Sequence, residues 1–201
     1  MEYELFRLSQ LDDDGMRRLA ALHHSVMRTL LSDLGLAMVL RYYQVARYDP
    51  LVIGLCALSP SGEMLGWALG SPHPDKLNSR LRTPFTRFLF QLLLLVFTRP
   101  LVLRQLISSV LRSSTHQDIE PGAIELTYIG VASDQRGKGW GKELLNAFME
   151  ASRLNGYRLV IVSVEIENTS AVALYEKAGF KIIETFWEGR YQRHRMELVL
   201  A

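Results

Sequence analysis

The chain has one cysteine, no long apolar run and almost no net charge, and each absence excludes a class of protein. Cys56 cannot form an internal disulfide, so we expect a core residue in a reducing, cytoplasmic compartment. The longest apolar run, residues 88–97, contains Gln91 and is shorter than the roughly twenty residues that span a bilayer. A formal charge of +2 gives no overall reason to expect nucleic acid as a ligand.

Metal-ligand spacing and two familiar nucleotide-binding motifs are missing as well. The five histidines are scattered and have no cysteine partner, which argues against a zinc site, and we expect no metal. The glycine-rich residues 137–141 have neither the spacing of a P-loop nor the Gly-x-Gly-x-x-Gly order of a dinucleotide fingerprint. The first residues lack a basic segment followed by an apolar one, so we expect no secretory signal.

What the sequence does contain is typical of a globular domain. A chain of 201 residues can bury a sizeable core, and 48% hydrophobic and 22% charged residues are ordinary values. We therefore predict one domain over residues 1–201.

Hydrophobic periodicity and turn residues predict an alternation of strands and helices. Strands are expected at residues 3–8, 51–58, 63–70, 124–132, 159–164, 181–186 and 193–199. Helices are expected at residues 12–31, 36–47, 142–154 and 168–178.

The most informative stretch lies between the predicted strand at 124–132 and the predicted helix at 142–154. Glycine occupies every second position from 137 to 141, and two cations, Arg136 and Lys138, lie among these residues. Glycine tolerates positive φ angles and lets a ligand approach the main chain, whose amide groups then point into one concavity. The stretch predicts a site for a pyrophosphate-bearing ligand, and a solvated turn before a helix is the alternative interpretation. Its residues are Gln135, Arg136, Gly137, Lys138, Gly139, Trp140 and Gly141.

Two separated motifs resemble the GNAT superfamily of acyl-CoA-dependent N-acyltransferases. Residues 136–141 match its Arg/Gln-x-x-Gly-x-Gly/Ala signature, and residues 168–180 are similar to its Asn-x-x-Ala-x-x-Leu-Tyr-x-x-x-Gly-Phe segment. The resemblance implies an α/β (α+β) fold with a mixed, mostly antiparallel central sheet flanked by helices. It also implies that the sheet is splayed between its fourth and fifth strands, with a helical insertion at about residues 71–123 before the fourth.

The resemblance further implies acetyl-CoA as cosubstrate. In the family the glycine-rich turn holds the CoA pyrophosphate, and the strand before it binds the pantetheine arm through its main chain. The residues implied in cofactor binding are Ile129, Gly130, Val131, Arg136, Gly137, Lys138, Gly139, Trp140, Gly141, Lys142, Asn168 and Tyr175.

Two of these residues have a second interpretation. The family's tyrosine at the position of Tyr175 is the usual general acid for the departing thiolate, whereas the residue pattern alone favours an aromatic ring packed in the core. Asn168 is either a helix cap or a contact to the CoA arm, and the two uses can coexist.

For the general base we predict Glu125. It lies six residues before Val131 on one strand, so we expect the two side chains to share a face of the sheet and Glu125 to point to one end of the cleft. Some family members carry a catalytic glutamate at the corresponding position, although a solvated carboxylate and deprotonation through an ordered water are alternatives. Glu165 and Glu167 are weaker candidates, and Asp134 is expected to face solvent.

The predicted insertion concentrates the basic charge of the chain. Residues 76–112 contain seven cations and no acidic residue, around the apolar run and a second expected short helix at residues 101–111. Three interpretations stay open: a helical hairpin over the acceptor end of the cleft, a homodimer contact, or peripheral contact with an anionic membrane. The segment is unusually apolar and has no base-reading module, so we expect no nucleic-acid role.

Together these features predict an N-acetyltransferase that transfers an acetyl group from acetyl-CoA to a primary amine of a small molecule or amino sugar. The acceptor's amine attacks directly in a ternary complex. The alternatives are a non-catalytic CoA-binding regulatory or interaction module, and an acetyltransferase that acts on a protein amine.

Overall fold

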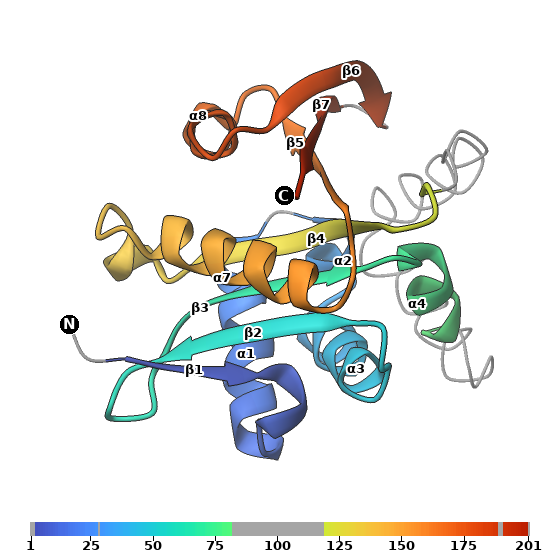
Figure 1. Ribbon diagram of the computed structural model, residues 1–201. Coiled ribbons are helices and arrows are strands. Elements are labelled where there is room, and N and C mark those ends of the chain that lie inside the picture. Colours follow the sequence, from blue (N-terminus) through green and yellow to red (C-terminus); the bar gives the residue numbers. More distant parts are fainter. Residues whose placement is uncertain (1–2, 28, 82–118, 189–190, 201) are drawn as a thin grey trace.

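The computed structural model describes residues 3–27, 29–81, 119–188 and 191–200. These residues form a seven-stranded sheet in the order β1-β2-β3-β4-β5-β7-β6, in which only the β4–β5 pair is parallel (Figure 1). The strands are β1 Glu4–Arg7, β2 Ile53–Leu58, β3 Met64–Ser71, β4 Ala123–Val131, β5 Leu159–Glu165, β6 Lys181–Glu188 and β7 Tyr191–Val199.

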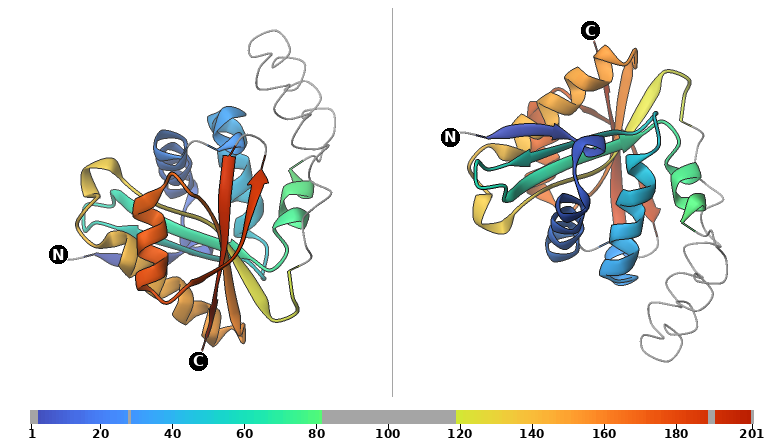
Figure 2. Two further views of the ribbon diagram at one scale, coloured as in Figure 1. Left: turned by 90° about the horizontal axis from the view of Figure 1, so that it is seen from above. Right: turned by 90° about the horizontal axis from the view of Figure 1, so that it is seen from below.

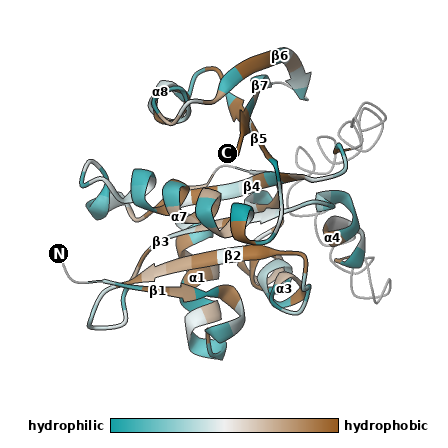
Figure 3. Cartoon of the chain, viewed as in Figure 1, coloured by the Kyte–Doolittle hydropathy of each residue, from teal (hydrophilic) through white to brown (hydrophobic). Residues whose placement is uncertain are grey.

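Helices cover the two faces of this sheet and divide the core into two clusters. Helices α1 (Asp13–Val26) and α3 (Leu36–Arg47) pack on one side, which we call the α1–α3 face, over β2, β3 and part of β4 (Figure 2). Helices α7 (Trp140–Leu154) and α8 (Thr169–Lys177) lie on the other side, the α7 face. Hydropathy follows this division, because the apolar sides of the helices turn toward the sheet (Figure 3).

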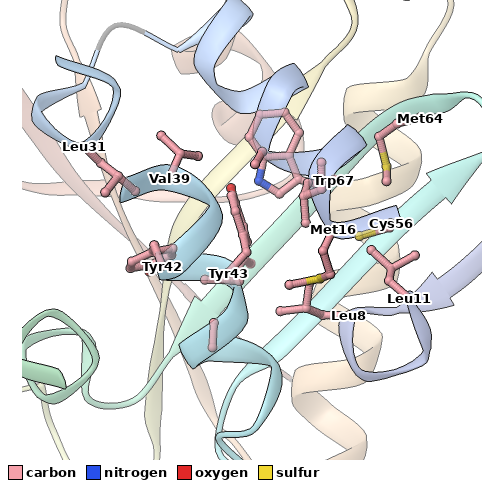
Figure 4. Packing of buried hydrophobic residues seen from close by; sticks show 14 of the residues in the cluster. Leu8, Leu11, Met16, Leu31, Val39, Tyr42, Tyr43, Cys56, Met64 and Trp67 are labelled. Carbon is pink, nitrogen blue, oxygen red and sulfur yellow. The ribbon is translucent and has the colours of Figure 1, made fainter. Parts of the chain in front are cut away.

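Cys56 lies in the cluster on the α1–α3 face, among residues from several elements (Figure 4). It is 1% exposed, and burial raises the pKa of its thiol to about 12. The prediction of a core cysteine is therefore confirmed, and this thiol is unreactive at neutral pH.

The predicted fold class and the order of the elements are confirmed, but the boundaries of two helices were wrong. The first helix ends at Val26, and a separate short helix, α2 (Leu30–Asp33), follows. The Thr29 hydroxyl accepts a hydrogen bond from the Ser32 amide (3.3 Å), which starts a new turn in place of a continuous helix. Helix α7 begins two residues earlier than predicted, at Trp140.

Only the two ends of the predicted insertion, residues 71–81 and 119–123, are described. The first of them contains a short helix, α4 (Pro74–Arg80), which packs against α3 and was not expected from the sequence. The predicted helices at residues 88–97 and 101–111 lie outside the described residues. Two 3-10 turns, Leu8–Gln10 and Ser133–Gln135, complete the described helical elements. In the described part of the chain, no helix is long and apolar enough to cross a membrane.

Strands β4 and β5 pair over four residues and then separate. The pairs run from Ala123 with Leu159 to Leu126 with Val162. Beyond them, within residues 3–27, 29–81, 119–188 and 191–200, β4 pairs only with β3, and β5 pairs only with β7. The expected splay between the fourth and fifth strands is thus confirmed, and among the described strands it leaves one edge of β4 without a partner.

Strands β3 and β4 approach closely where Gly130 lies opposite Trp67. A Cβ atom at Gly130 would overlap the indole ring of Trp67, which is 1% exposed. The absence of a side chain at Gly130 lets the Trp67 ring pack directly against the backbone of β4.

We expect Gly130→Ala to lower the free energy of unfolding by about 1–3 kcal/mol, because the buried ring must move to admit the methyl group. The matched control is Gly141→Ala, in helix α7, where an added Cβ would meet only the Leu174 side chain at 3.4 Å. Urea unfolding of both variants measures the difference. Equal stability of the two would contradict this account of the strand contact.

Candidate active site

The glycine-rich turn joins the end of β4 to the start of α7. Gly137 and Gly139 take φ angles of 76° and 89°, which side-chain-bearing residues rarely adopt. An added Cβ at either position would meet open space, so it is the backbone angle, and not crowding, that selects glycine. Arg136 and Lys138 are exposed beside the turn.

Helix α7 begins at this turn without a side-chain cap. Gly139 is its N-cap residue, and no side chain accepts a hydrogen bond from the first turn. In the described part of the chain, the amides of residues 136–141 donate no hydrogen bond. Unpaired amides and the positive end of the helix dipole make this end of α7 a place where an anion is stabilised. Trp140 anchors the turn, because its side chain is 5% exposed. Its ring packs edge to face against that of Tyr3, with the ring centres 4.7 Å apart.

Tyr175 lies on α8 in the cluster of the α7 face. It is 3% exposed, and its ring packs against Phe180 with the ring centres 5.5 Å apart. Burial raises the pKa of the phenol well above its usual value, so the hydroxyl stays protonated at neutral pH. This hydroxyl has no hydrogen-bond partner among the described residues, yet it is not one of the side-chain atoms sealed from solvent. The ring of Tyr175 is therefore packed in the core, while its hydroxyl is available as a hydrogen-bond donor.

Asn168 caps helix α8. Its Oδ1 atom accepts hydrogen bonds from the Ala171 amide (3.3 Å) and the Ser170 hydroxyl (3.1 Å). The capping interpretation of this residue is confirmed, and its contact with the CoA arm stays a prediction.

The expected face of Glu125 was wrong. Leu69 of β3 lies opposite Tyr128, but the next residue, Gly70, lies opposite Leu126, so Thr127 is an extra residue in β4. Such a β-bulge reverses the alternation of side chains beyond it. Leu126 and Val131 therefore both face α7, whereas Glu125 lies on the α1–α3 face with Tyr128.

The other candidate carboxylates, Glu165, Glu167 and Asp134, come from the segments after β4 and at the end of β5. Glu165, at the end of β5, is on the same face as Glu125 and meets Arg193 of β7 at 3.4 Å. Glu167 is exposed. Asp134 is exposed as predicted, and accepts a hydrogen bond from Gln135 at 2.7 Å.

Sequence reasoning missed a polar group on the α1–α3 face beside the parting strands. Arg193 bridges Glu165 and Glu188, at 3.4 and 2.8 Å, and its Nε atom is buried without a partner. Burial raises the pKa of the Tyr128 hydroxyl and the guanidinium of Arg193 opposes the shift, while Glu188 and Glu125 add to it. The bulge places Glu125 on the same face as Tyr128, beside Arg193. A bulge cannot be recognised from the sequence pattern.

His23 of α1 lies behind Tyr128 and is 0% exposed. Its Nδ1 atom is 2.7 Å from the Tyr43 hydroxyl, and its ring meets the Tyr128 ring edge to face at 4.8 Å. Burial, and then the nearby His24, lower the pKa of His23 to about 4. The neutral imidazole is thus part of an aromatic wall behind the bulge. In the described part of the chain, no group of His, Cys, Asp and Glu residues could hold a metal ion.

This fold and site agree with the comparison to protein families. Residues 19–180 match the model of the acetyltransferase (GNAT) family. The chain therefore belongs to the GNAT acetyltransferase family, as its two motifs indicated.

Curated relatives match over a shorter stretch. Mycothiol acetyltransferase of Corynebacterium glutamicum (strain R) is 42% identical over 65 residues, which are 32% of this chain and 22% of that protein. L-methionine sulfoximine/L-methionine sulfone acetyltransferase of Pseudomonas paraeruginosa is 38% identical over 52 residues, which are 26% of this chain and 30% of that protein. The chain thus spans less than a third of the length of these relatives.

Solved structures share the fold over nearly the whole chain. A GCN5-related N-acetyltransferase from Kribbella flavida superposes with a TM-score of 0.64 at 16% identity, covering 98% of each chain. The ribosomal-protein-S18-alanine N-acetyltransferase from Escherichia coli has a TM-score of 0.62 at 13% identity, covering 100% of this chain and 95% of that one. At such identities the likeness establishes the fold alone.

The buried His23 predicts how stability depends on pH. Its pKa is about 4 in the folded chain and about 6.5 when unfolded, so below pH 6.5 the unfolded chain binds the proton first. Stability therefore falls as the pH falls from 6.5 to 4, by about 3 kcal/mol from this group. Other carboxylates titrate in the same range, so the informative quantity is the difference from His23→Gln.

Urea unfolding of both proteins between pH 7 and pH 4 measures that difference. We expect the unmodified chain to lose more stability than the variant on acidification. Parallel pH profiles would contradict a neutral, buried His23.

Proposed function

We propose that this protein transfers an acetyl group from acetyl-CoA to the primary amine of a small molecule or amino sugar, by direct attack in a ternary complex. The observation that carries the proposal is the edge of β4 that no described strand pairs with, which leads into the uncapped, glycine-rich start of α7. A strand edge suits the amides of a pantetheine arm, and the start of the helix suits a diphosphate.

Cofactor binding is assigned to main-chain groups first. The amides of residues 137–141 would hold the diphosphate, with Arg136, Lys138 and Lys142 adding positive charge, because all three are exposed beside them. Ile129, Gly130 and Val131 would bind the pantetheine arm through their free edge. In this assignment the side chains of residues 129–131 would not contact the cofactor, so the strand itself needs no particular sequence.

Because of the bulge, the proposed general acid and the proposed general base lie on opposite faces of the sheet. Tyr175 is on the α7 face, and Glu125 is on the opposite face. The amine nitrogen attacks the thioester carbonyl carbon, the C–N bond forms and the C–S bond breaks. Glu125, directly or through water, first takes a proton from the ammonium, so that a neutral amine attacks. The second nitrogen proton leaves to water as the C–S bond breaks, and Tyr175 donates a hydrogen bond or proton to the thiolate.

The acceptor class rests on the relatives' names and on the polar group beside the gap. The matched relatives are named for small molecules, mycothiol and L-methionine sulfoximine or sulfone. Among the described residues, the carboxylates of Glu125, Glu165 and Glu188 outnumber the guanidinium groups of Arg193 and Arg195 on this face, a balance that favours a cationic amine. A thiol-release assay over amino acids, amino sugars and polyamines tests the proposal. Absence of CoA release with every amine, while CoA still binds, would favour a regulatory CoA-binding module.

Tyr175→Phe tests the general acid. Because the hydroxyl has no partner among the described residues, we expect unchanged stability and an unchanged KM for acetyl-CoA. We expect kcat to fall about a hundredfold, since proton donation to the thiolate is lost. Steady-state kinetics and a thermal melt measure the two effects. A kcat within about twofold of the original would remove Tyr175 from the chemistry.

Gly139→Val tests the diphosphate site. The substitution strains the positive φ angle and places a branched side chain where the amides meet the ligand, so we expect CoA affinity to fall at least about tenfold. The matched control is Gly156→Val, with a φ angle of 82° and equal open space, after the end of α7. Isothermal titration with CoA should find weaker binding only for Gly139→Val. Equal affinities would refute the assignment.

A further inference from the structure

Strand β6 forms the outer edge of the sheet, and no described element lies beyond it (Figure 1). Three of its apolar residues, Ile182, Ile183 and Trp187, are 45%, 50% and 67% exposed. Apolar colour along β6 in Figure 3 marks the same strand. An open edge with large apolar side chains is a template for pairing with another strand, unless something covers it.

A second β-bulge sets which side chains of β6 share a face. Ile182 lies opposite Met196 of β7, and Glu184 lies opposite the adjacent Arg195, so Ile183 is an extra residue. Two residues of the bulged strand therefore occupy the space of one on any neighbouring strand.

Because of this bulge, corresponding residues at the two ends of β6 lie on the same face of the sheet. Lys181 and Glu188, seven residues apart, would be on opposite faces of a regular strand, and here they are on the same face. Ile182 and Trp187 are likewise together on the other face, which is that of the buried Met196.

We propose that β6 pairs antiparallel with β6 of a second copy of this chain, about a two-fold axis at Thr185. In that register, Trp187 lies opposite the Ile182–Ile183 bulge of the second copy, and Glu188 lies opposite its Lys181. Residues directly opposite one another in an antiparallel pair share a face, and the observed faces satisfy this condition at both ends.

Charge supports a second copy as the occupant. On the chain's own β7, Lys181 lies opposite Glu197, and Glu188 forms an ion pair with Arg193 at 2.8 Å. Pairing two copies extends this row to Glu197, Lys181, Glu188 and Arg193, with the sign alternating at every step. A strand of unrelated sequence would have to supply both charges, whereas a second copy supplies them by symmetry.

Single charge reversals test this interface by sedimentation velocity over a range of concentrations. Lys181→Glu places two glutamates opposite one another at each end, and Glu188→Lys places two lysines there. We expect each variant alone to raise the dimer dissociation constant at least about tenfold, because like charges oppose one another twice.

Mixing the two variants gives the decisive result. In a heterodimer of Lys181→Glu with Glu188→Lys, every pair at the two ends is again a glutamate opposite a lysine. We therefore expect the equimolar mixture to regain dimers that neither variant forms alone at that concentration. No intramolecular effect of either substitution would produce such a rescue.

Trp187→Asp tests the apolar part, and we expect it to abolish dimers at micromolar concentration. Leu154→Asp, at an equally exposed leucine that ends α7, is the control and should leave dimers unchanged. Circular dichroism verifies folding, and if Trp187→Asp unfolds, the charge variants decide. A monomeric unmodified chain, or dimers that survive the reversals and gain nothing from mixing, would overturn the proposal.

Discussion

Backbone groups on the inner edge of β4 have no partner in any described strand after Leu126, because β5 turns away at Val162 and stays with β7. Unpaired N–H and C=O groups inside a fold are costly unless water or a ligand satisfies them. The rest of the site is arranged around this edge, with the uncapped start of α7 at its end and Tyr175 packed on the α7 face. A main-chain site of the proposed kind needs few particular side chains, which agrees with a fold shared with solved acetyltransferases at 13–16% identity.

The two faces of the sheet offer different chemical environments. On the α7 face, an almost wholly apolar cluster keeps the Tyr175 phenol protonated. On the α1–α3 face, the bulge at Thr127 brings Glu125 and Tyr128 together beside the ion pairs of Arg193. Behind them lies the buried His23, whose ring packs against that of Tyr128. A proton donor and a proton acceptor on opposite sides of one gap is the arrangement that the proposed transfer requires.

Features with a regular period or with characteristic turn and cap residues could be predicted from the sequence. Features that arise where a strand departs from regular pairing could not. Helix periods, the Gly137–Gly141 spacing and the Asn168 cap follow from local chemistry, so the elements and the fold class could be predicted. The face of Glu125 could not, because one extra residue in β4 reverses the alternation and leaves no mark in the sequence. The end of α1 at Val26 likewise depends on the hydrogen bond of Thr29 to Ser32, a contact that periodicity does not contain.

A crystal structure with coenzyme A bound tests the central claim most directly. The account predicts the diphosphate against the amides of residues 137–141, the pantetheine arm hydrogen-bonded along residues 129–131, and the sulfur within hydrogen-bond reach of the Tyr175 hydroxyl. Density for coenzyme A at any other surface, with the edge of β4 unoccupied, would contradict it.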